Sequence, residues 1–264
     1  MNSSYDELGK RQRAKKIKRI VSVATIVFAL TSWYLFTTGL NLVPTLFFPS
    51  PSNVLDTLIQ VRNSILQHTL ITMIRVIASF LLGSLMGMVV GLLMSRYQVI
   101  FALLEPPIEA LRPIPPIALI PFFILWFGIG DFGKLLLAGI GCFMVMVIST
   151  IEAVRNVPRI YTQAAQSLGA DDAYTYRTVV IPAIVPELIA GWRVALALAF
   201  ALMIAAELMG AQSGLGFMIM VARRSLNTPT ILLGIIIIGI LAFLVDRMLN
   251  LFANRLTRWT ERTN

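Results

Sequence analysis

The sequence predicts an all-α membrane protein with six transmembrane helices, and its composition is the first reason. Apolar residues make up 57% of the 264 positions and charged residues only 13%, whereas soluble domains are typically about 45–50% apolar and about 25% charged. The second reason is that apolar runs close to the roughly 20 residues needed to cross a hydrocarbon core recur along the chain. We therefore expect the bilayer to be its main solvent.

The apolar runs place the six spans at residues 20–40, 70–94, 108–128, 134–154, 184–208 and 230–252. The first span follows a basic segment at residues 1–19 and is longer than a signal-peptide core, so we expect it to be retained. With six spans, most Lys and Arg residues fall on the side of both termini, including the tail at residues 253–264. The positive-inside rule assigns that side to the cytoplasm.

This charge asymmetry accounts for the formal charge of +9 without a nucleic-acid partner. The single cysteine, Cys142, lies inside an apolar run, so neither a disulfide framework nor a cysteine-based metal site is expected. His68 is the only histidine, and the sequence holds no HExxH, GxSxG or phosphate-binding GxxxxGK[ST] motif. We expect no enzymatic activity, cofactor or metal, so any ATP hydrolysis would reside on another polypeptide.

The second span carries glycines at four-residue spacing, Gly83, Gly87 and Gly91. This spacing places them on one face of a helix, where the absence of side chains lets a neighbouring helix approach closely. Helix packing is the favoured interpretation of this face, ahead of a role in binding a solute.

The third span is irregular, because the stretch RPIPPIALIP contains four prolines, including Pro115 and Pro116. Proline removes a backbone donor and clashes with the preceding turn, so we expect a kinked or broken segment. Irregular backbone at membrane depth is tolerated where it lines a cavity, which makes Pro115 and Pro116 candidates for a pathway wall. A kinked structural helix explains the prolines equally well.

Charged residues within spans are costly and are treated as functional by default. Arg75 and Glu207 lie near the same end of the second and fifth spans, where they are placed to pair. Arg193 lies deeper, and for Arg193 and Glu207 an ion pair or polar network is favoured over contact with a solute. For Arg75, Glu187 and Asp246, which lie near the ends of spans, the favoured interpretation is that these side chains extend to the headgroups.

The stretch AQSGLGFMIMVARR after the fifth span is apolar, interrupted by glycines and too short to cross the membrane. It predicts either a re-entrant turn or outer gate, or a plain loop with a short helix.

The loop at residues 156–182 predicts a helical elbow between the fourth and fifth spans. Leu168 lies on one face of a first helix, and Gly169 is placed to end it in a left-handed cap. Asp171 is placed to cap a second helix, which Pro182 would stop before the next span. An ordinary amphipathic connector fits the periodicity as well, but it does not explain the alanine pair, glycine and proline together.

At these residues the sequence resembles the EAA loop of transmembrane subunits of ATP-binding-cassette importers. The matching positions are Gln163-Ala164-Ala165, Gly169 and Val180-Ile181-Pro182, with Gln163 in place of the usual glutamate. The resemblance covers residues 65–248 and is closest to the nitrate, sulfonate and taurine branch, through RPIPPIALIPFFILWFGIG, AAQSLGA, IVPELIAGWR and AAELMGAQSGLGFM in the expected order.

The resemblance implies a type I importer permease of the bacterial inner membrane that carries a small anion. It also implies a second copy of the chain, two cytosolic ATP-binding subunits docked on the elbow, and an extracytoplasmic solute-binding protein. Bicarbonate and pyrimidine vitamin precursors are alternative solutes within the branch. A secondary carrier working alone, or a membrane scaffold, are the alternatives from other classes.

Overall fold

A computed structural model describes residues 17, 20–40, 44 and 46–257, and its described residues form helices, turns and irregular segments without a strand. Within these described residues, five helices are long and apolar enough to cross a membrane, and a bent helix pair raises the number to six if it counts as one span. The chain divides into two compact units, residues 1–62 with 222–233 and residues 63–221 with 234–264. The segment at residues 1–19 lies outside the described residues except for Ile17, and the tail is described to residue 257.

The smaller unit contains the helix Ile20–Gly39, whose last residues Leu35–Gly39 are π-helical, and the helix α2 (Pro51–Gln60). The Ser50 hydroxyl caps α2 by accepting from the Asn53 backbone N–H at 3.3 Å.

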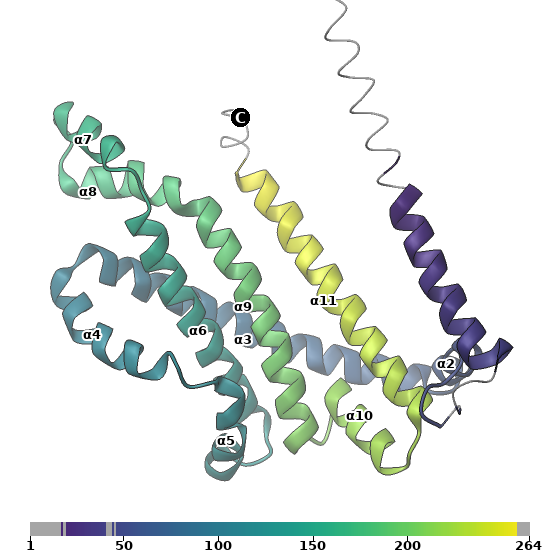
Figure 1. Cartoon of the computed structure of the whole chain (residues 1–264). Helices are drawn as coiled ribbons and strands as arrows, with labels where there is room; N and C mark the ends of the chain where they lie inside the picture. Colours follow the sequence, from purple (N-terminus) through teal and green to yellow (C-terminus); the bar gives the residue numbers. More distant parts are fainter. Residues whose placement is uncertain (1–16, 18–19, 41–43, 45, 258–264) are drawn as a thin grey trace, which may run out of the picture. The chain divides into compact units, whose positions relative to one another are not determined.

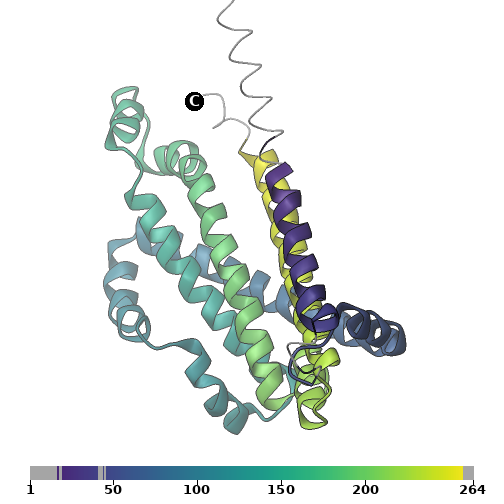
Figure 2. The same ribbon diagram turned by 45° about the vertical axis from the view of Figure 1, so that its right-hand side comes forward.

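The larger unit is built from the remaining helices, seen in Figures 1 and 2. In chain order they are α3 (Arg62–Arg96), α4 (Gln98–Leu111), η2 (Pro116–Leu119), α5 (Ile120–Phe127), α6 (Asp131–Arg155), α7 (Arg159–Ser167), α8 (Asp172–Thr175), η3 (Tyr176–Val180), α9 (Ile181–Gly210), α10 (Leu215–Arg224) and α11 (Thr228–Leu256). The last residues of α10 and the first residues of α11 belong to the smaller unit.

The core of the larger unit lies between α6 and α9, which run side by side in both views (Figures 1 and 2). Small and flexible residues meet there, with Cys142 and Met146 of α6 packed among Ala195, Ala199 and Met203 of α9, all of them buried. Small side chains let two helices approach closely in a bilayer, where lipid offers no hydrophobic drive for association.

The expected single span at residues 108–128 is replaced by two helical pieces. The helix α4 and the segment Pro116–Phe127 meet at an angle of 80°. Residues 112–115 form the break, because Pro113, Pro115 and Pro116 leave too few backbone donors to continue the helix. The sequence predicted a kink there, but the helix before it begins at Gln98 and contains Pro106 and Pro107, which the prediction missed.

The glycine face of α3 packs against α6. A Cβ atom on Gly83 would collide with the Gly139 carbonyl, and one on Gly91 would lie 2.7 Å from the Thr150 Cβ. A Cβ on Gly87 would collide with the Phe143 carbonyl oxygen. Glycines four residues apart on α3 therefore contact residues at similar intervals along α6. This is the close helix packing that the glycine spacing predicts.

We predict that Gly87→Ala destabilises the protein, because the added methyl group has no space against α6. The expected cost is about 1–3 kcal/mol, as for other overpacked cores, and the measurement is the thermal unfolding midpoint of the purified protein in detergent. Gly239→Ala is the matched control, since a Cβ at this helical glycine meets nothing within 4 Å. Equal midpoints for the two variants would contradict the packing of α3 on α6.

Candidate functional site

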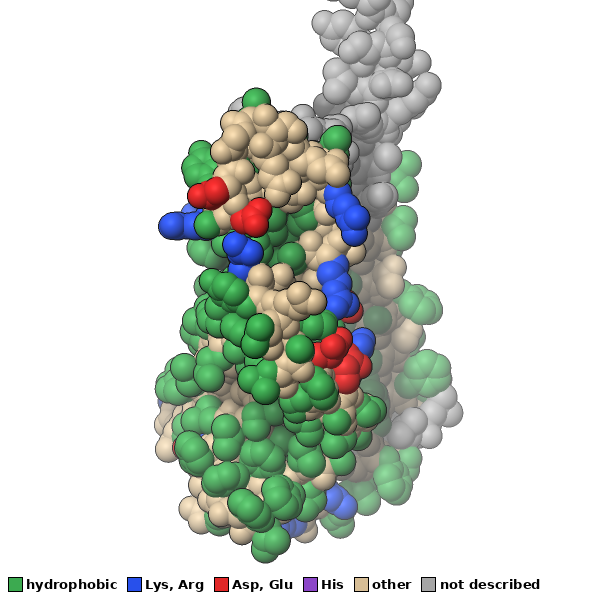
Figure 3. Space-filling view, turned by 90° about the vertical axis from the view of Figure 1, so that its left-hand side faces the viewer, with side chains coloured by type: hydrophobic (Ala, Val, Ile, Leu, Met, Phe, Trp, Pro, Cys, Tyr) green, Lys and Arg blue, Asp and Glu red, His purple; other side chains and the backbone are tan. Residues whose placement is uncertain are grey.

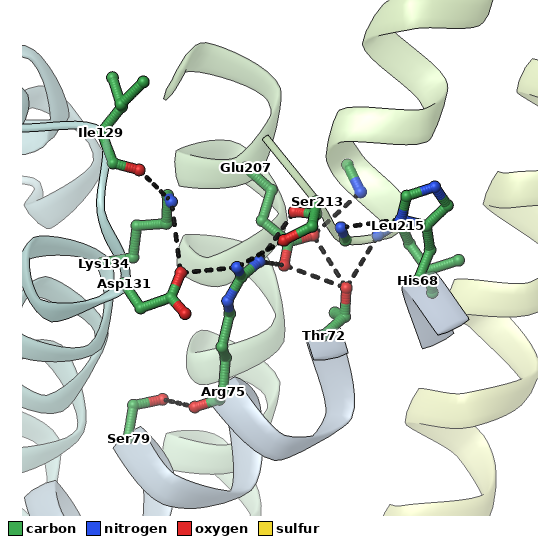
Figure 4. Close-up of polar contacts among 12 residues, drawn as sticks. His68, Thr72, Arg75, Ser79, Ile129, Asp131, Lys134, Glu207, Ser213 and Leu215 are labelled. Carbon is green, nitrogen blue, oxygen red and sulfur yellow. Dashed lines mark hydrogen bonds and ion pairs between the residues drawn. The ribbon is translucent and has the colours of Figure 1, made fainter. Parts of the chain in front are cut away.

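A buried carboxylate, Glu207, lies at the centre of a polar cluster in the larger unit (Figure 4). The Glu207 side chain is fully buried near the end of α9. Its two oxygens accept from the Thr72 hydroxyl at 3.0 and 2.9 Å, and from the Gly216 backbone N–H at 3.0 Å. Arg75 donates to it at 2.8 Å, so the expected contact between Arg75 and Glu207 is present.

Arg75 joins four parts of the chain (Figure 4). From α3, its Nη1 also donates to the Ser213 carbonyl oxygen at 2.8 Å, and its Nη2 donates to the Ser213 hydroxyl at 2.9 Å. The same Nη2 contacts Asp131 Oδ1 of α6 at 2.6 Å. Arg75 is 5% exposed, so the interpretation that its side chain extends to the headgroups is wrong. The cationic group is held by carboxylates on α6 and α9 instead.

Asp131 and Lys134 belong to this cluster and were missed by the sequence analysis. The Lys134 ammonium donates to the Ile129 carbonyl oxygen at 2.6 Å and lies 3.7 Å from Asp131 Oδ1. Both residues resemble the polar border of a span, because they stand just before the apolar run of α6 that begins at Leu135. The sequence does carry one signal for this cluster, which is charge balance. Two cations, Arg75 and Lys134, match two carboxylates, Glu207 and Asp131.

The loop after α9 closes over Glu207 through its glycines. Gly214 has φ +110°, and a Cβ there would collide with the Glu207 carboxylate. The Gly214 and Leu215 backbone N–H groups donate to His68 Nδ1 at 3.1 Å and to the Thr72 hydroxyl at 2.8 Å. The start of α10 is therefore held against α3, and its first N–H groups lie close to a buried negative charge, which a helix N-terminus favours.

Arg193 has a partner of its own. Its Nε and Nη2 atoms donate to the two carboxylate oxygens of Asp246 on α11, at 2.8 and 3.1 Å. The expected ion pair of Arg193 is thus present, with Asp246 as its partner. Both side chains are partly exposed, at 47% and 35%, and extension of Asp246 to the headgroups stays a prediction. Pro115 is exposed and Pro116 half-buried at the start of η2; their role in a pathway wall stays a prediction.

The elbow is a second candidate site, and its turn is specified by backbone hydrogen bonds. Gly169 has φ +85° directly after α7. Its N–H donates to the Gln166 carbonyl at 2.9 Å and the Ala170 N–H donates to the Ala165 carbonyl at 3.1 Å, the pair of bonds of a Schellman motif. Asp171 Oδ1 then caps α8 by accepting from the Tyr174 N–H at 2.6 Å. Gly169 and Asp171 therefore lie in the backbone positions that the sequence predicts.

The outer surface of α7 is left uncovered by the part of the chain that the structure describes. None of its residues is buried, Gln163 and Ala164 are exposed, Ala165 is half-buried, and Leu168 is 89% exposed. An apolar side chain this exposed is typical of a surface that another protein covers.

Pro182 does not stop the second elbow helix, contrary to expectation. The helical run is continuous from Asp172 to Gly210. A π-helical turn, Tyr176–Val180, lies immediately before Pro182 and includes a bond from the Ile181 N–H to the Tyr176 carbonyl. Its wider spacing accommodates the proline ring, which would clash with the carbonyl of residue i−4 in a regular α-helix.

The face that carries α4 and α5 separates charged from apolar side chains (Figure 3). Lys, Arg, Asp and Glu gather mainly toward the end that carries α7 and α8, and hydrophobic side chains cover most of the remainder. Val99, Leu103, Leu125 and Trp126 are each more than two-thirds exposed. Such a surface fits a bilayer better than water.

Comparisons with known proteins agree with one another. Residues 79–258 match the family model described as "Binding-protein-dependent transport system inner membrane component". The taurine transport system permease protein TauC of Escherichia coli (strain K12) is 35% identical over 90% of this chain and 89% of its own. The SsuC protein of Bacillus subtilis (strain 168), whose name refers to aliphatic sulfonates transport, is 32% identical over 84% of this chain and 81% of its own.

A solved structure shares the fold. A chain of the inward-facing MetNI methionine ABC transporter superimposes with a TM-score of 0.61 at 18% identity, covering 75% of this chain and 98% of the other.

We predict that Arg75→Gln is more damaging than Glu207→Gln. Without Arg75, the Glu207 charge is buried among neutral donors only, a loss that typically costs about 3–5 kcal/mol. Without the Glu207 charge, Arg75 still pairs with Asp131, whose side chain is 58% exposed. The double variant should be more stable than Arg75→Gln alone. The thermal unfolding midpoints of all three in detergent test this order, and equal losses in the two single variants would contradict it.

Proposed function

The chain belongs to the family of binding-protein-dependent transport system inner membrane components, and from this premise we propose that it forms the path by which taurine or another aliphatic sulfonate enters the cell. It is the multi-pass permease subunit of an ABC importer in the bacterial inner membrane. The observation that carries the proposed solute class is the similarity, over more than four-fifths of both chains, to two permeases, one named for taurine transport and one for aliphatic sulfonates transport.

The relatives also favour a second solute. The riboflavin transport system permease protein RibX of Chloroflexus aurantiacus (strain ATCC 29366 / DSM 635 / J-10-fl) is 30% identical over 89% of this chain. RibX is less similar to this chain than TauC and SsuC are, so riboflavin is the second candidate solute after a sulfonate.

The proposed assembly contains two copies of this chain, two cytosolic ATP-binding subunits and an extracytoplasmic solute-binding protein. The sequence lacks a phosphate-binding loop, so ATP would be hydrolysed by the partner. The exposed surface of α7, with Gln163, Ala164 and Leu168, is the proposed docking surface. Gln163 removes one charge from this surface relative to the family pattern, and the Schellman turn beside it is intact.

The proposed coupling runs along one continuous helix. The run Asp172–Gly210 has 39 residues, which corresponds to about 58 Å at 1.5 Å per residue. The elbow lies at one end of this run and Glu207 near the other. Movement of a docked ATPase would therefore displace the loop held by Glu207 and Arg75 at the opposite side of the membrane, as alternating access requires.

The proposed orientation places both termini and the elbow in the cytoplasm. The excess of Lys and Arg on this side supports it, and so does the elbow, because ATP is a cytosolic nucleotide. Glu207 and its partners would then lie toward the outer face, where a binding protein delivers solute.

The uptake experiment that tests the solute uses the whole importer in cells lacking the gene for this chain. Restoring the gene should restore uptake of labelled taurine at least tenfold above background. Nitrate and riboflavin uptake, measured in the same cells, should stay at background. Restored riboflavin uptake without taurine uptake would replace the proposal by the second candidate.

We predict that Gly169→Val lowers both ATPase co-purification and solute uptake without reducing the amount of permease in the membrane. A Cβ at Gly169 meets nothing within 4 Å, so the cost is the strain of positive φ, on the order of 1–2 kcal/mol. Gly169→Asn is the matched control, because Asn tolerates this conformation, and it should keep both activities. Equal loss in both variants would show that the side chain, and not the backbone conformation, matters there.

A further inference from the structure

A cavity of about 360 Å³ lies between the last turns of α3 and the start of the long helical run. Its lining comes from two parts of the larger unit and consists of Val89, Leu92, Leu93, Arg96, Tyr97, Ala173, Tyr176, Arg177 and Ile181. The two walls are tied together by one hydrogen bond, from the Tyr176 hydroxyl to the Leu92 carbonyl at 2.9 Å. An occupant would therefore touch α3 and the base of the elbow at once.

The charge of this cavity is entirely positive. Among the described residues that line it, Arg96 and Arg177 are the charged ones, and none is a carboxylate. Among residues 46–257, neither arginine forms an ion pair. Arg96 lies over the rings of Tyr97 and Tyr176, at 5.8 and 5.9 Å from their centroids, and these contacts leave its N–H donors available. The nearby acids are occupied elsewhere, since Asp171 caps α8 and Asp172 accepts from Gln166.

A second cavity, of about 270 Å³, is also lined by Arg96. It is lined by Ser95, Gln98 and Arg155 among others, again with no carboxylate. Arg155 lies 5.3 Å from the centroid of the Phe101 ring. Arg96 thus lines both cavities, together with Arg177 in the first and Arg155 in the second.

The position of the cavity in the membrane decides what it can hold. Arg96 is the last residue of the span Arg62–Arg96, and Arg177 lies near the beginning of the run Asp172–Gly210. Arginines at the ends of apolar spans are expected near the boundary of the hydrocarbon region. On the hydrocarbon side of the arginines, Val89 and Leu93 are 51% and 40% exposed.

We propose that this cavity binds an anionic phospholipid, with its phosphate held by Arg96 and Arg177 and an acyl chain lying along Val89 and Leu93. Arginine forks match phosphate oxygens, and basic pockets between membrane helices are suited to anionic headgroups. The aliphatic wall distinguishes this ligand from a free phosphate ion, which gains nothing from apolar contact. A bound lipid would brace the base of the elbow against α3. The proposal does not depend on the transported solute.

The test uses the full-length protein purified in a neutral detergent. Added phosphatidylglycerol should raise the thermal unfolding midpoint by about 3 °C or more, whereas phosphatidylcholine and inorganic phosphate should not. The double variant Arg96→Gln/Arg177→Gln should lose at least three-quarters of this rise. Arg159→Gln is the matched control, since Arg159 is exposed on α7 outside both cavities, and it should keep the full rise.

A second variant covers the case in which the double substitution fails to fold. Leu93→Trp fills the apolar wall and leaves both arginines, and it should also reduce the effect of phosphatidylglycerol. An equal rise with phosphatidylcholine or with phosphate alone would overturn the proposal. So would an undiminished rise in Leu93→Trp, or in a folded double variant.

Discussion

Burial of the Glu207 carboxylate is the constraint on which the rest of the larger unit depends. An ionised carboxylate at membrane depth is tolerated only when its charge is neutralised and its oxygens accept hydrogen bonds. Thr72, Arg75 and Gly216 meet this need from α3 and from the start of α10. Arg75 in turn forms a second ion pair, with Asp131 on α6. One buried charge thereby fixes the relative placement of three membrane helices and a loop.

The same requirement explains the glycines around the cluster. Gly214 stands where any side chain would occupy the volume of the Glu207 carboxylate. A Cβ on Gly216 would lie 2.6 Å from the Glu207 Cβ. The loop can donate its N–H groups to the buried acceptors only because its backbone comes this close.

Features that depend on local rules can be predicted from this sequence, whereas features that depend on packing cannot. The Gly169 turn and the Asp171 cap follow from residue types at fixed spacing, and the Arg75–Glu207 contact follows from the scarcity of charges in the spans. Asp131 and Lys134 were missed because a charge at the end of an apolar run usually faces water. Pro182 was assigned as a stop because the π-helical turn that accommodates it leaves no recognisable sequence pattern. Similarly, Pro106 and Pro107 lie inside a helix, where local rules predict a break.

The π-helical turn between the elbow and α9 also determines how far the elbow is rotated about the helix axis relative to α9. A π-turn is an α-helix with one additional residue accommodated, and each residue turns an α-helix by about 100°. The side of the elbow that faces away from the bundle is therefore determined by the number of residues in Tyr176–Val180 as much as by their identity. Deleting a single residue there would turn the proposed docking surface by more than a quarter of a revolution, and it would also restore the α-helical spacing in which the Pro182 ring clashes with a backbone carbonyl.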